Sequence, residues 1–338
     1  MEINRKALID FVKNEAENCN VFVIGDVMLD KYFYGEVTRI SPEAPVPVTR
    51  VTRTKETLGG AANVAHNLAL MKANTLISGF IGRDYHGESL SAQFSSRGID
   101  TRGLIATDAP TTTKLRVIGG HQQMLRLDFE DALPADDKAT NALIKFVKKE
   151  IKNHPPRSAI ILSDYGKGIC TEKTCTEIIE AAKKYKVPLI VDPKGNDWSK
   201  YSGADFITPN LKELNEVQKT PAKNNDSEVE RAARYAMRKF HIGGMVATRS
   251  ECGLTLVRSR EVINIPTKAQ EVFDVSGAGD TVIAIFALAI AGGIAPSSAA
   301  YLANLAASVV VARLGTYAIS NEELSEALKK EMKNIKRA

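Results

Sequence analysis

Short runs rich in β-branched residues alternate with helix-like patterns from Val21 onward, and this alternation constrains the fold more than any other feature. Between the first two runs, residues 60–73 place small and apolar side chains at i, i+3, i+4, i+7 and i+8, which is one face of a helix. Alternating strands and helices form a parallel sheet covered on both faces. The sequence therefore predicts an α/β fold with strands at VFVIGDV, NTLISGFIG, SAIILSDY, PLIVDP, ADFITPN and GMVATRS, a late hairpin of GLTLVRS and EVINIPT, and helices from Ala278, Ser297 and Glu322.

Two stretches, residues 31–57 and 104–130, interrupt the alternation. Both contain strand-like runs, and neither contains a helical pattern of its own. In the second stretch, TTTKLRVIGG and QQMLRLDFE flank a Gly-Gly pair. Two strand-rich excursions from one α/β body predict a small accessory sheet. We expect a single domain, residues 1–338, that carries this sheet.

The first excursion contains RISPEAPVPV, residues 39–48. Its three prolines exclude a helix interior, because each proline fixes φ and lacks an N–H donor. Pro45 and Pro47 are two residues apart, so in an extended strand their missing N–H groups lie on the same edge. Such a strand pairs on its other edge only. We predict a strand of the accessory sheet with one open edge, with Arg39, Ser41 and Glu43 on one face.

Charge, cysteine content and hydropathy exclude several classes of protein. The net charge of +5, from 45 Lys and Arg against 40 Asp and Glu, is too small to indicate a nucleic-acid partner. The four cysteines form no CxxC pair and the five histidines are scattered, so we expect reduced thiols and no zinc site. The apolar run TVIAIFALAIA is shorter than the ~20 residues that span a bilayer. With no signal peptide in evidence, we expect a cytoplasmic protein without a membrane partner.

The segment DVSGAGDT, residues 274–281, carries the strongest chemical signal. Small residues at the start of an apolar helix leave N–H groups free at the positive end of the helix dipole, which suits an anion. Asp280 lies in the first turn, where a carboxylate can act as a general base in phosphoryl transfer. The alternative is an ordinary acidic residue at a helix N-terminus. The sequence contains no GxxxxGK[ST] loop, and GAGDTV has Val282 where a dinucleotide fingerprint needs its third glycine.

TPNLKE, residues 208–213, follows a predicted strand and opens a helix. Asn210 and Glu213 are three residues apart and could hold Mg²⁺ through water. Helix capping by Asn210 and a solvated face at Glu213 are the alternatives.

Two motifs near the N-terminus suit a sugar ligand. In LGGAAN, Gly59 and Gly60 permit close approach of the backbone, and Asn63 can bond a hydroxyl group. In GDVMLD, Asp30 is expected at the carboxyl end of the first strand, where open α/β sheets bind ligands. A turn aspartate is the alternative for Asp30.

These four motifs, in this order, resemble those of the PfkB or ribokinase family of sugar kinases over residues 21–318. GGAAN and DVSGAGD match the two signatures of that family. The resemblance implies an ATP-dependent kinase with a ribokinase-like, mostly parallel sheet, helices on both faces and a small β lid over the sugar.

The resemblance also assigns roles to single residues. It implies that Asp280 is the catalytic base, and that the transferring phosphoryl group is held by the N–H groups of Gly277, Ala278 and Gly279. It assigns the sugar to Asp30, Gly59, Gly60 and Asn63. It assigns MgATP to Asn210, Glu213, Thr248, Ser250, Gly253 and Asn304. Asp274 and Ser276 fall where some members hold a potassium ion.

Longer strings narrow the match. RISPEAPVPV, TTTKLRV, QQMLRLDFED, LSDYGKG and VDPKG look like the D-glycero-β-D-manno-heptose-7-phosphate kinase branch. That branch phosphorylates O1 to give the 1,7-bisphosphate on the route to ADP-heptose and lipopolysaccharide. Many relatives carry a fused nucleotidyltransferase domain with an HxGH motif, which this sequence lacks. We therefore expect the kinase-only form and a separate nucleotidyltransferase.

A substrate phosphate needs cations. Lys114 and Arg116 alternate onto one face of a predicted lid strand, and Lys167 and Lys194 follow strand ends. We assign Arg116 and Lys167 to the sugar phosphate and Lys194 to the nucleotide, with solvated surface charges as the alternative for each. Other readings are a PfkB-type kinase for another sugar, and a non-catalytic binding paralogue. Apolar outer faces on the lid lead us to expect a homodimer.

Overall fold

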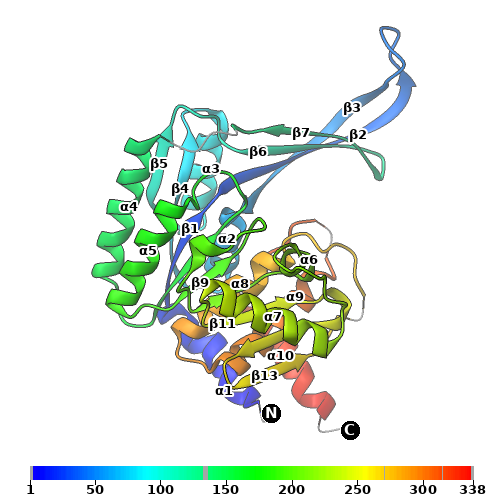
Figure 1. Cartoon of the computed structure of the whole chain (residues 1–338). Helices are drawn as coiled ribbons and strands as arrows, with labels where there is room; N and C mark the ends of the chain where they lie inside the picture. Colours follow the sequence, from blue (N-terminus) through cyan, green and yellow to red (C-terminus); the bar gives the residue numbers. More distant parts are fainter. Residues whose placement is uncertain (1–2, 132–135, 270, 314, 336–338) are drawn as a thin grey trace.

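The computed structural model describes residues 3–131, 136–269, 271–313 and 315–335. Its body is a nine-stranded sheet in the order β13-β12-β11-β10-β9-β8-β1-β4-β5 (Figure 1). Neighbouring strands from β11 to β5 are parallel, whereas β12 is antiparallel to both β11 and β13. The strands are β1 (Asn20–Gly25), β4 (Asn74–Gly82), β5 (Asp100–Thr107), β8 (Ser158–Ser163), β9 (Leu189–Asp192), β10 (Phe206–Ile207), β11 (Gly244–Thr248), β12 (Leu254–Arg258) and β13 (Glu261–Ile265).

Each face of this sheet has its own apolar core, because successive side chains of a strand point to opposite faces. On β1, Val21 and Val23 join one cluster, and Phe22 and Ile24 join the other. The first cluster includes side chains of α1 (Arg5–Asp10), α2 (Ala61–Leu70), α3 (Tyr85–Ser95), α8 (Ala278–Ala291), α9 (Pro296–Val310) and α10 (Asn321–Ile335). The second includes α4 (Asp137–Lys152), α5 (Glu172–Tyr185), α6 (Leu211–Glu216) and α7 (Asp226–Phe240). The predicted mostly parallel sheet with helices on both faces is confirmed.

Helix α8 packs over the centre of the sheet, against β1, β8 and β9, and beside α9. Its residues from Asp280 to Ala289 are all buried, as expected for a helix that is apolar all round. The predicted starts at Ala278, Ser297 and Glu322 lie within one residue of the starts of α8, α9 and α10. In the described part of the chain, no helix has both the length and the apolar character needed to cross a membrane.

A second sheet, which we call the lid sheet, projects from the body (Figure 1). Its strands, in the order β3-β2-β6-β7, are β2 (Val27–Ile40), β3 (Pro47–Gly60), β6 (Thr113–Gly119) and β7 (Gln122–Phe129). The predicted accessory sheet is confirmed. Its strands occupy 27–60 and 113–129 rather than 31–57 and 104–130, because Leu104 pairs with Gly79 in the large sheet.

RISPEAPVPV does not form one continuous strand as predicted; its last two residues, Pro47 and Val48, begin β3, which lies at the edge of the lid sheet and pairs on one side only. Ile40 ends β2 and pairs with Pro47 at the start of β3, and residues 41–46 form the turn between them. Pro45 therefore lies in a turn, where its fixed φ is as well suited as in an edge strand. The segment is the tip of a long hairpin, far from the body (Figure 1).

Candidate active site

The glycine-rich segment of residues 274–281 lies before α8 and ends in its first turn. Gly277 precedes the helix with φ +81°, a conformation that glycine adopts without strain. A Cβ at Gly277 would lie 2.9 Å from Asn63 Nδ2, whereas a Cβ at Gly279 would meet nothing within 4 Å. At the helix start, the space beside Gly277 is therefore filled by Asn63, whereas the space beside Gly279 is free.

The N–H groups of this segment differ in availability. The N–H of Ala278 donates to the Val275 carbonyl at 3.2 Å. Among the described residues, the N–H groups of Gly277, Gly279 and Asp280 have no protein acceptor. Free N–H groups at a helix N-terminus bind anions. The geometry therefore supports an anion at this helix start, with the Ala278 N–H already engaged.

Asp280 is 5% exposed, and both of its carboxylate oxygens accept hydrogen bonds. Asn63 Nδ2 donates to Oδ2 at 2.7 Å, and the Tyr165 hydroxyl donates to Oδ1 at 2.5 Å. Burial raises the pKa of Asp280 from its usual 3.8 to about 6; the two hydrogen bonds oppose this rise, as does Lys114, whereas Asp30 adds to it. A carboxylate with a pKa near 6 is ionised at neutral pH and still accepts a proton readily.

A cavity of about 200 Å³ lies beside Gly279, where β8, β9, β10 and β11 end. Open α/β sheets bind ligands at the carboxyl ends of their strands. The lining residues are Asp164, Tyr165, Asp192, Pro193, Lys194, Thr208, Asn210, Glu213, Thr248 and Gly279. The structure thus brings the predicted nucleotide-side residues Lys194, Asn210, Glu213 and Thr248 to one cavity, next to the glycine-rich helix start.

Asn210 and Glu213 form a capping box at the start of α6. Asn210 Oδ1 accepts the Glu213 N–H at 2.9 Å, and Glu213 Oε2 accepts the Asn210 N–H at 3.0 Å. Lys194 Nζ lies 3.2 Å from Glu213 Oε1. Asn210 therefore caps the helix, which was the alternative reading. Glu213 is both part of the cap and part of the cavity wall.

Asp192, the last residue of β9, adds a second carboxylate to this wall. Burial raises its pKa well above the usual value, and the charges of Glu213 and Asp280 raise it further. Thr208 Oγ1 donates to Asp192 Oδ1 at 3.2 Å. Carboxylates that repel one another around a single cavity are suited to a divalent cation with oxygen ligands. Asp192 and Glu213 therefore fit Mg²⁺.

Three residues predicted on the nucleotide side do not line this cavity. Ser250 lies in a single helical turn with φ +50°, and Gly253 follows with φ +81°. A Cβ at Gly253 would lie 2.1 Å from the Ile265 carbonyl oxygen. Asn304 is buried in α9, and its Nδ2 donates to the Pro266 carbonyl at 2.9 Å. In this structure these residues shape the turn before β12 and tie α9 to the end of β13.

The sequence predicted Asp30 at the carboxyl end of the first strand, and this prediction is wrong. The first strand ends at Gly25, and Asp30 lies in β2 at the base of the lid sheet. Its Oδ1 accepts a hydrogen bond from Arg116 Nη1 at 2.6 Å, and the two side chains are 11% and 23% exposed. A Cβ at Gly59 would lie 2.6 Å from Asp30 Oδ2, so only glycine leaves room beside this carboxylate.

Gly60 ends β3 with φ +55°, and a Cβ there would lie 2.7 Å from the Asp26 carbonyl oxygen. The next helix, α2, begins at once and presents Asn63 to Asp280. The glycine pair thus lets the lid sheet turn directly into the helix that supports the candidate base.

The predicted cations differ in their partners. Lys167 Nζ lies 2.7 Å from Glu130, and Lys167 lines a separate cavity of about 50 Å³ beneath the lid sheet. Arg116 is paired with Asp30. Lys114 has no carboxylate within ion-pair distance among the described residues. Its Nζ lies 5.9 Å from the centre of the Tyr165 ring, and burial lowers its pKa. Lys114 is therefore a cation without a carboxylate partner among the described residues, and its charge acts on the candidate base.

Asp274 stabilises the start of the glycine-rich segment. Its Oδ1 accepts the Ser276 N–H at 2.9 Å, and its Oδ2 accepts the Gly315 N–H at 3.0 Å. Burial raises the pKa of Asp274, but these hydrogen bonds outweigh it and the net change is a lowering. A potassium ion near Asp274 and Ser276 stays a prediction.

Sequence reasoning missed Tyr165 and Asp192 as site residues. Both lie at the carboxyl end of a parallel strand, Tyr165 just after β8 and Asp192 at the end of β9. LSDYGKG and VDPKG supplied Lys167 and Lys194 as predicted site residues because they follow strand ends, and the same rule applied to the residues just before these lysines predicts Tyr165 and Asp192.

Residues 19–324 match the model of the pfkB family of carbohydrate kinases, and the chain belongs to this family. The buried Asp280 carboxylate, the glycine-rich helix start and the cavity beside it are the features of this structure that suit a carbohydrate kinase. Over 315 residues the chain is 43% identical to the bifunctional protein HldE of Haemophilus influenzae strain PittEE, which covers 93% of this chain and 64% of that protein. Over 328 residues it is 40% identical to HldE of Koribacter versatilis, which covers 97% of this chain and 67% of that protein. The chain spans about two thirds of the length of these relatives.

Solved structures share the fold at lower identity. Phosphofructokinase-2 from Escherichia coli in complex with potassium has a TM-score of 0.74 and 18% identity, over 92% of this chain and 98% of that one. Ribokinase from Arabidopsis thaliana, complexed with ribose and ATP, has a TM-score of 0.72 and 20% identity, over the same shares. The fold is therefore ribokinase-like.

Proposed function

We propose that the protein is an ATP-dependent kinase that phosphorylates O1 of D-glycero-β-D-manno-heptose 7-phosphate. The observation that carries the reaction type is Asp280, a buried carboxylate at an open helix N-terminus beside a cavity. The heptose substrate is supported by the resemblance of RISPEAPVPV and similar strings, and by 43% identity to HldE. The product would be the 1,7-bisphosphate, an intermediate for ADP-heptose and lipopolysaccharide, and a nucleotidyltransferase would use it next.

In this proposal the Asp280 carboxylate accepts the proton of O1 while O1 attacks the γ-phosphorus of ATP. The new bond joins O1 to phosphorus, and the bond from phosphorus to the bridging oxygen breaks, so its electron pair leaves with ADP. The free N–H groups of Gly277 and Gly279 stabilise negative charge on the transferring oxygens. A positioned base of this kind contributes about 10²- to 10⁴-fold in rate.

Asp192 and Glu213, with Asn210 beside them, would hold the magnesium of MgATP through water, which supplies charge neutralisation at the phosphate oxygens. Lys194 lies beside Glu213 and adds a positive charge on the nucleotide side. Thr248 completes this wall of the cavity.

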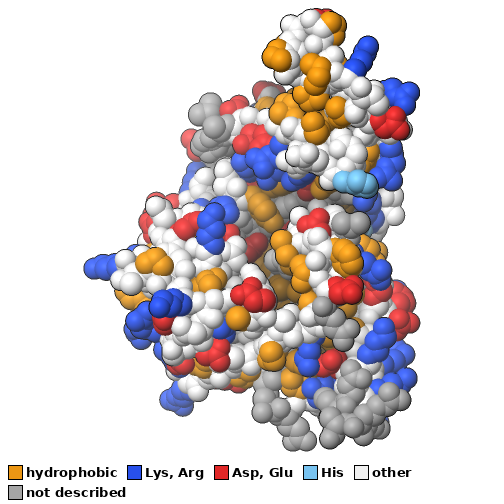
Figure 2. All heavy atoms as spheres, turned by 90° about the vertical axis from the view of Figure 1, so that its right-hand side faces the viewer, with side chains coloured by type: hydrophobic (Ala, Val, Ile, Leu, Met, Phe, Trp, Pro, Cys, Tyr) orange, Lys and Arg blue, Asp and Glu red, His pale blue; other side chains and the backbone are white. Residues whose placement is uncertain are grey.

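The sugar is assigned to the base of the lid sheet, at Asp30, Gly59, Gly60 and Asn63. We assign the 7-phosphate to Arg116 and Lys167, and we add Lys114 to this proposal because it has no carboxylate partner among the described residues and lies near Tyr165. A guanidinium has five N–H donors, so Arg116 can bond Asp30 and an anion together. The hollow below the lid sheet is visible in Figure 2.

The test is an ATP-dependent phosphorylation assay with heptose 7-phosphate, fructose 6-phosphate and ribose, in potassium or sodium buffer, with NMR of the product. We expect turnover of the heptose phosphate and a new phosphate on its anomeric carbon. A preference for fructose 6-phosphate or ribose would replace this substrate by that of another PfkB-type kinase. A failure of all three, with ATP still bound, would favour the non-catalytic paralogue.

The lid sheet also supports a proposed homodimer. Large apolar side chains are exposed on its strands and hairpin tip: Val37, Ile40, Val46, Val51, Met124, Leu125, Leu127 and Phe129. Figure 2 shows apolar side chains gathered on this projecting part. Patches of this kind mark protein–protein contacts.

We place the enzyme in the cytoplasm, where its four free cysteines stay reduced.

A further inference from the structure

Tyr165 contacts the candidate base and has no part in the mechanism above. It lies directly after β8, and its hydroxyl donates to Asp280 Oδ1 at 2.5 Å. Asn63, from α2, donates to Oδ2. Two donors on two oxygens fix the plane of the carboxylate. Burial, with the nearby charges of Asp280 and Asp192, raises the pKa of Tyr165, so the phenol keeps its proton and remains the donor.

The backbone around Tyr165 is held by a carboxylate on the neighbouring strand. Asp26, directly after β1, is buried, and its Oδ2 accepts the N–H groups of Tyr165 at 2.7 Å and Lys167 at 3.0 Å. Its Oδ1 accepts the N–H of Ile169 at 3.2 Å. Because three N–H groups converge on one side chain, the segment after β8 has little freedom to move.

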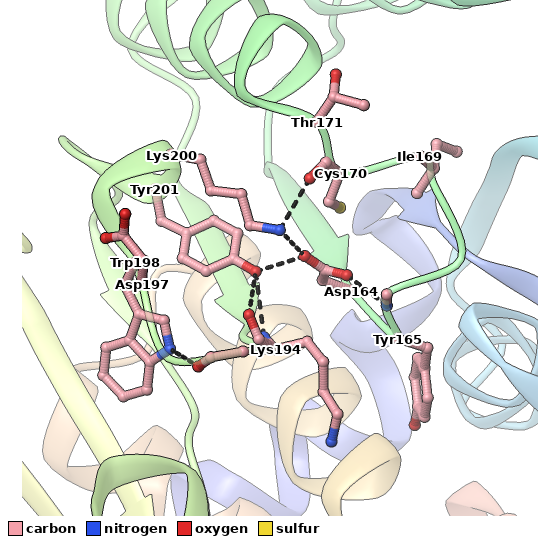
Figure 3. A network of polar contacts seen from close by, with 12 residues as sticks. Asp164, Tyr165, Ile169, Cys170, Thr171, Lys194, Asp197, Trp198, Lys200 and Tyr201 are labelled. Carbon is pink, nitrogen blue, oxygen red and sulfur yellow. Dashed lines mark hydrogen bonds and ion pairs between the residues drawn. The ribbon is translucent and has the colours of Figure 1, made fainter. Parts of the chain in front are cut away.

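A second network holds the other side of the same segment (Figure 3). Asp164 Oδ2 accepts hydrogen bonds from Lys200 Nζ and the Tyr201 hydroxyl, both at 2.5 Å. Lys200 also donates to the Cys170 carbonyl at 2.9 Å. Figure 3 shows the Tyr165 side chain pointing away from these contacts. The phenol is thus carried on a rigid support and directed at one target, Asp280.

Charged groups from several elements face the candidate base and enter any account of its titration. Asp30 on β2, Lys114 on β6 and Asp192 on β9 interact with Asp280 itself, and Glu213 on α6 interacts with its neighbours Asp192 and Tyr165. Within the described part of the chain, none of these four charged groups forms a hydrogen bond to Asp280, whereas Tyr165 and Asn63 both donate one to its carboxylate.

We propose that Tyr165 is a positioning residue for Asp280, whose hydroxyl orients the carboxylate and favours its ionised form. The proposal rests on the role of Asp280 as base in the proposed function. It also explains why a tyrosine is placed on so rigid a segment, since a loosely held phenol would orient nothing.

The test is Tyr165→Phe, which removes the hydroxyl and keeps the ring that lines the cavity and lies beside Lys114. A hydrogen bond to a charged group is strong enough to move a pKa by about one unit. The donor stabilises the ionised carboxylate, so its loss raises the pKa of Asp280. We expect the acidic limb of the pH–kcat profile to move up by about one pH unit, with KM for MgATP nearly unchanged. A purely structural role would lower kcat by one factor at every pH, and that result would overturn the proposal.

A readout without turnover separates this inference from the substrate assignment. Aspartate labelled with ¹³C at Cγ reports each carboxyl by NMR, and Asp280→Asn identifies the Asp280 signal. In magnesium-free buffer we expect this signal to titrate near pH 6 in the wild type and higher in Tyr165→Phe. An unmoved titration refutes the role of Tyr165 whichever sugar is the substrate. Failure of the heptose assay alone refutes only the substrate.

Tyr201→Phe is the matched control, because it removes a buried hydroxyl from Asp164 and none from Asp280. We expect it to leave the Asp280 titration in place. An equal shift in both variants would assign the effect to loosening of the segment and overturn the proposal. Should Tyr165→Phe not fold, 3-fluorotyrosine at position 165 is a stronger donor and should move the Asp280 titration downward.

Discussion

Asp280→Asn tests the candidate base most directly. The amide has the shape of the carboxylate and cannot accept the O1 proton. We expect kcat to fall about 10²- to 10⁴-fold, with both KM values within a few-fold of wild type. Because Asp280 lies inside the packed helix α8 and its neighbours stay in place, both substrates should still bind.

The same substitution should also change the free energy of unfolding, because it removes a buried carboxylate that is ionised at neutral pH. The pKa of Asp280 is about 6 in the folded protein against its usual 3.8, a difference of about two pH units. Each unit corresponds to about 1.4 kcal/mol, so ionised Asp280 lowers the free energy of unfolding by about 3 kcal/mol above pH 6. In the other direction, an amide whose nitrogen faces Asn63 Nδ2 pairs two donors, which costs about 1–3 kcal/mol, whereas an amide that points its nitrogen at the Tyr165 hydroxyl avoids this cost, because a hydroxyl also accepts. The net gain at pH 8 is therefore between about 0 and 3 kcal/mol.

The change of this stability difference with pH is a sharper test than its value at pH 8. Any hydrogen-bond cost of the introduced amide is the same at every pH, so it cancels from the change. A raised carboxyl pKa means that the folded protein holds the proton more tightly than the unfolded chain. The stability of the wild type therefore falls as pH rises from about 4 to about 6, and the variant lacks this fall. Between pH 5 and pH 8, the stability of Asp280→Asn relative to wild type should rise by about 1–1.5 kcal/mol.

The assay is urea unfolding at pH 5, 6, 7 and 8, followed by the fluorescence of the single tryptophan, the buried Trp198. Asp274→Asn is the control, because the pKa of Asp274 is lowered: Asp274 is ionised in both the folded and the unfolded chain from pH 5 to pH 8, so the relative stability of this variant should stay flat there. Turnover of Asp280→Asn above about a tenth of wild type would refute the base. A stability difference between Asp280→Asn and wild type that stays flat from pH 5 to pH 8 would refute the raised pKa of Asp280 in the folded protein.

Three further outcomes test the rest of the site. Arg116→Ala should raise KM for the phosphorylated sugar at least about tenfold and KM for ATP far less, and equal changes in both KM values would contradict the phosphate assignment. The same variant should destabilise the fold by about 2–3 kcal/mol, because Asp30 loses its partner. Gly277→Ala should lower stability by about 1–3 kcal/mol through its φ of +81° and its contact with Asn63, whereas Gly279→Ala should fold normally and impair turnover; thermal melts and kcat measure both. Leu125→Asp should produce monomers in light scattering if the lid forms the dimer interface, and an unchanged mass would remove that interface.

Local patterns in the sequence determined the elements of this fold. The helix starts at Ala278, Ser297 and Glu322 follow from apolar periodicity and small residues, and the structure places them within one residue. The parallel sheet and its covering helices follow from alternation alone. The accessory sheet was predicted from two interruptions, because strands without helices need partners outside the parallel sheet.

The same local patterns misplaced features whose conformation depends on pairing. RISPEAPVPV fits an edge strand and a turn equally well by proline spacing, and the pairing of Ile40 with Pro47 selects the turn. Asp30 was predicted after the first strand, but the chain continues at once into β2. Ser250 and Asn304 make structural contacts here, and their predicted role in nucleotide binding stays a prediction.

By itself the sequence determined which residue types are available: a glycine-rich helix start, an aspartate in its first turn, and polar residues after each strand. Only the tertiary structure decided which of them meet. Tyr165 reaches Asp280 across 115 positions and Asn63 reaches it across 217. Such contacts depend on how the two sheets and the helices pack together, which brings the segments after β3 and β8 to the start of α8. The chemistry of Asp280 is therefore set by neighbours that no local pattern specifies, because burial and distant hydrogen bonds fix its pKa.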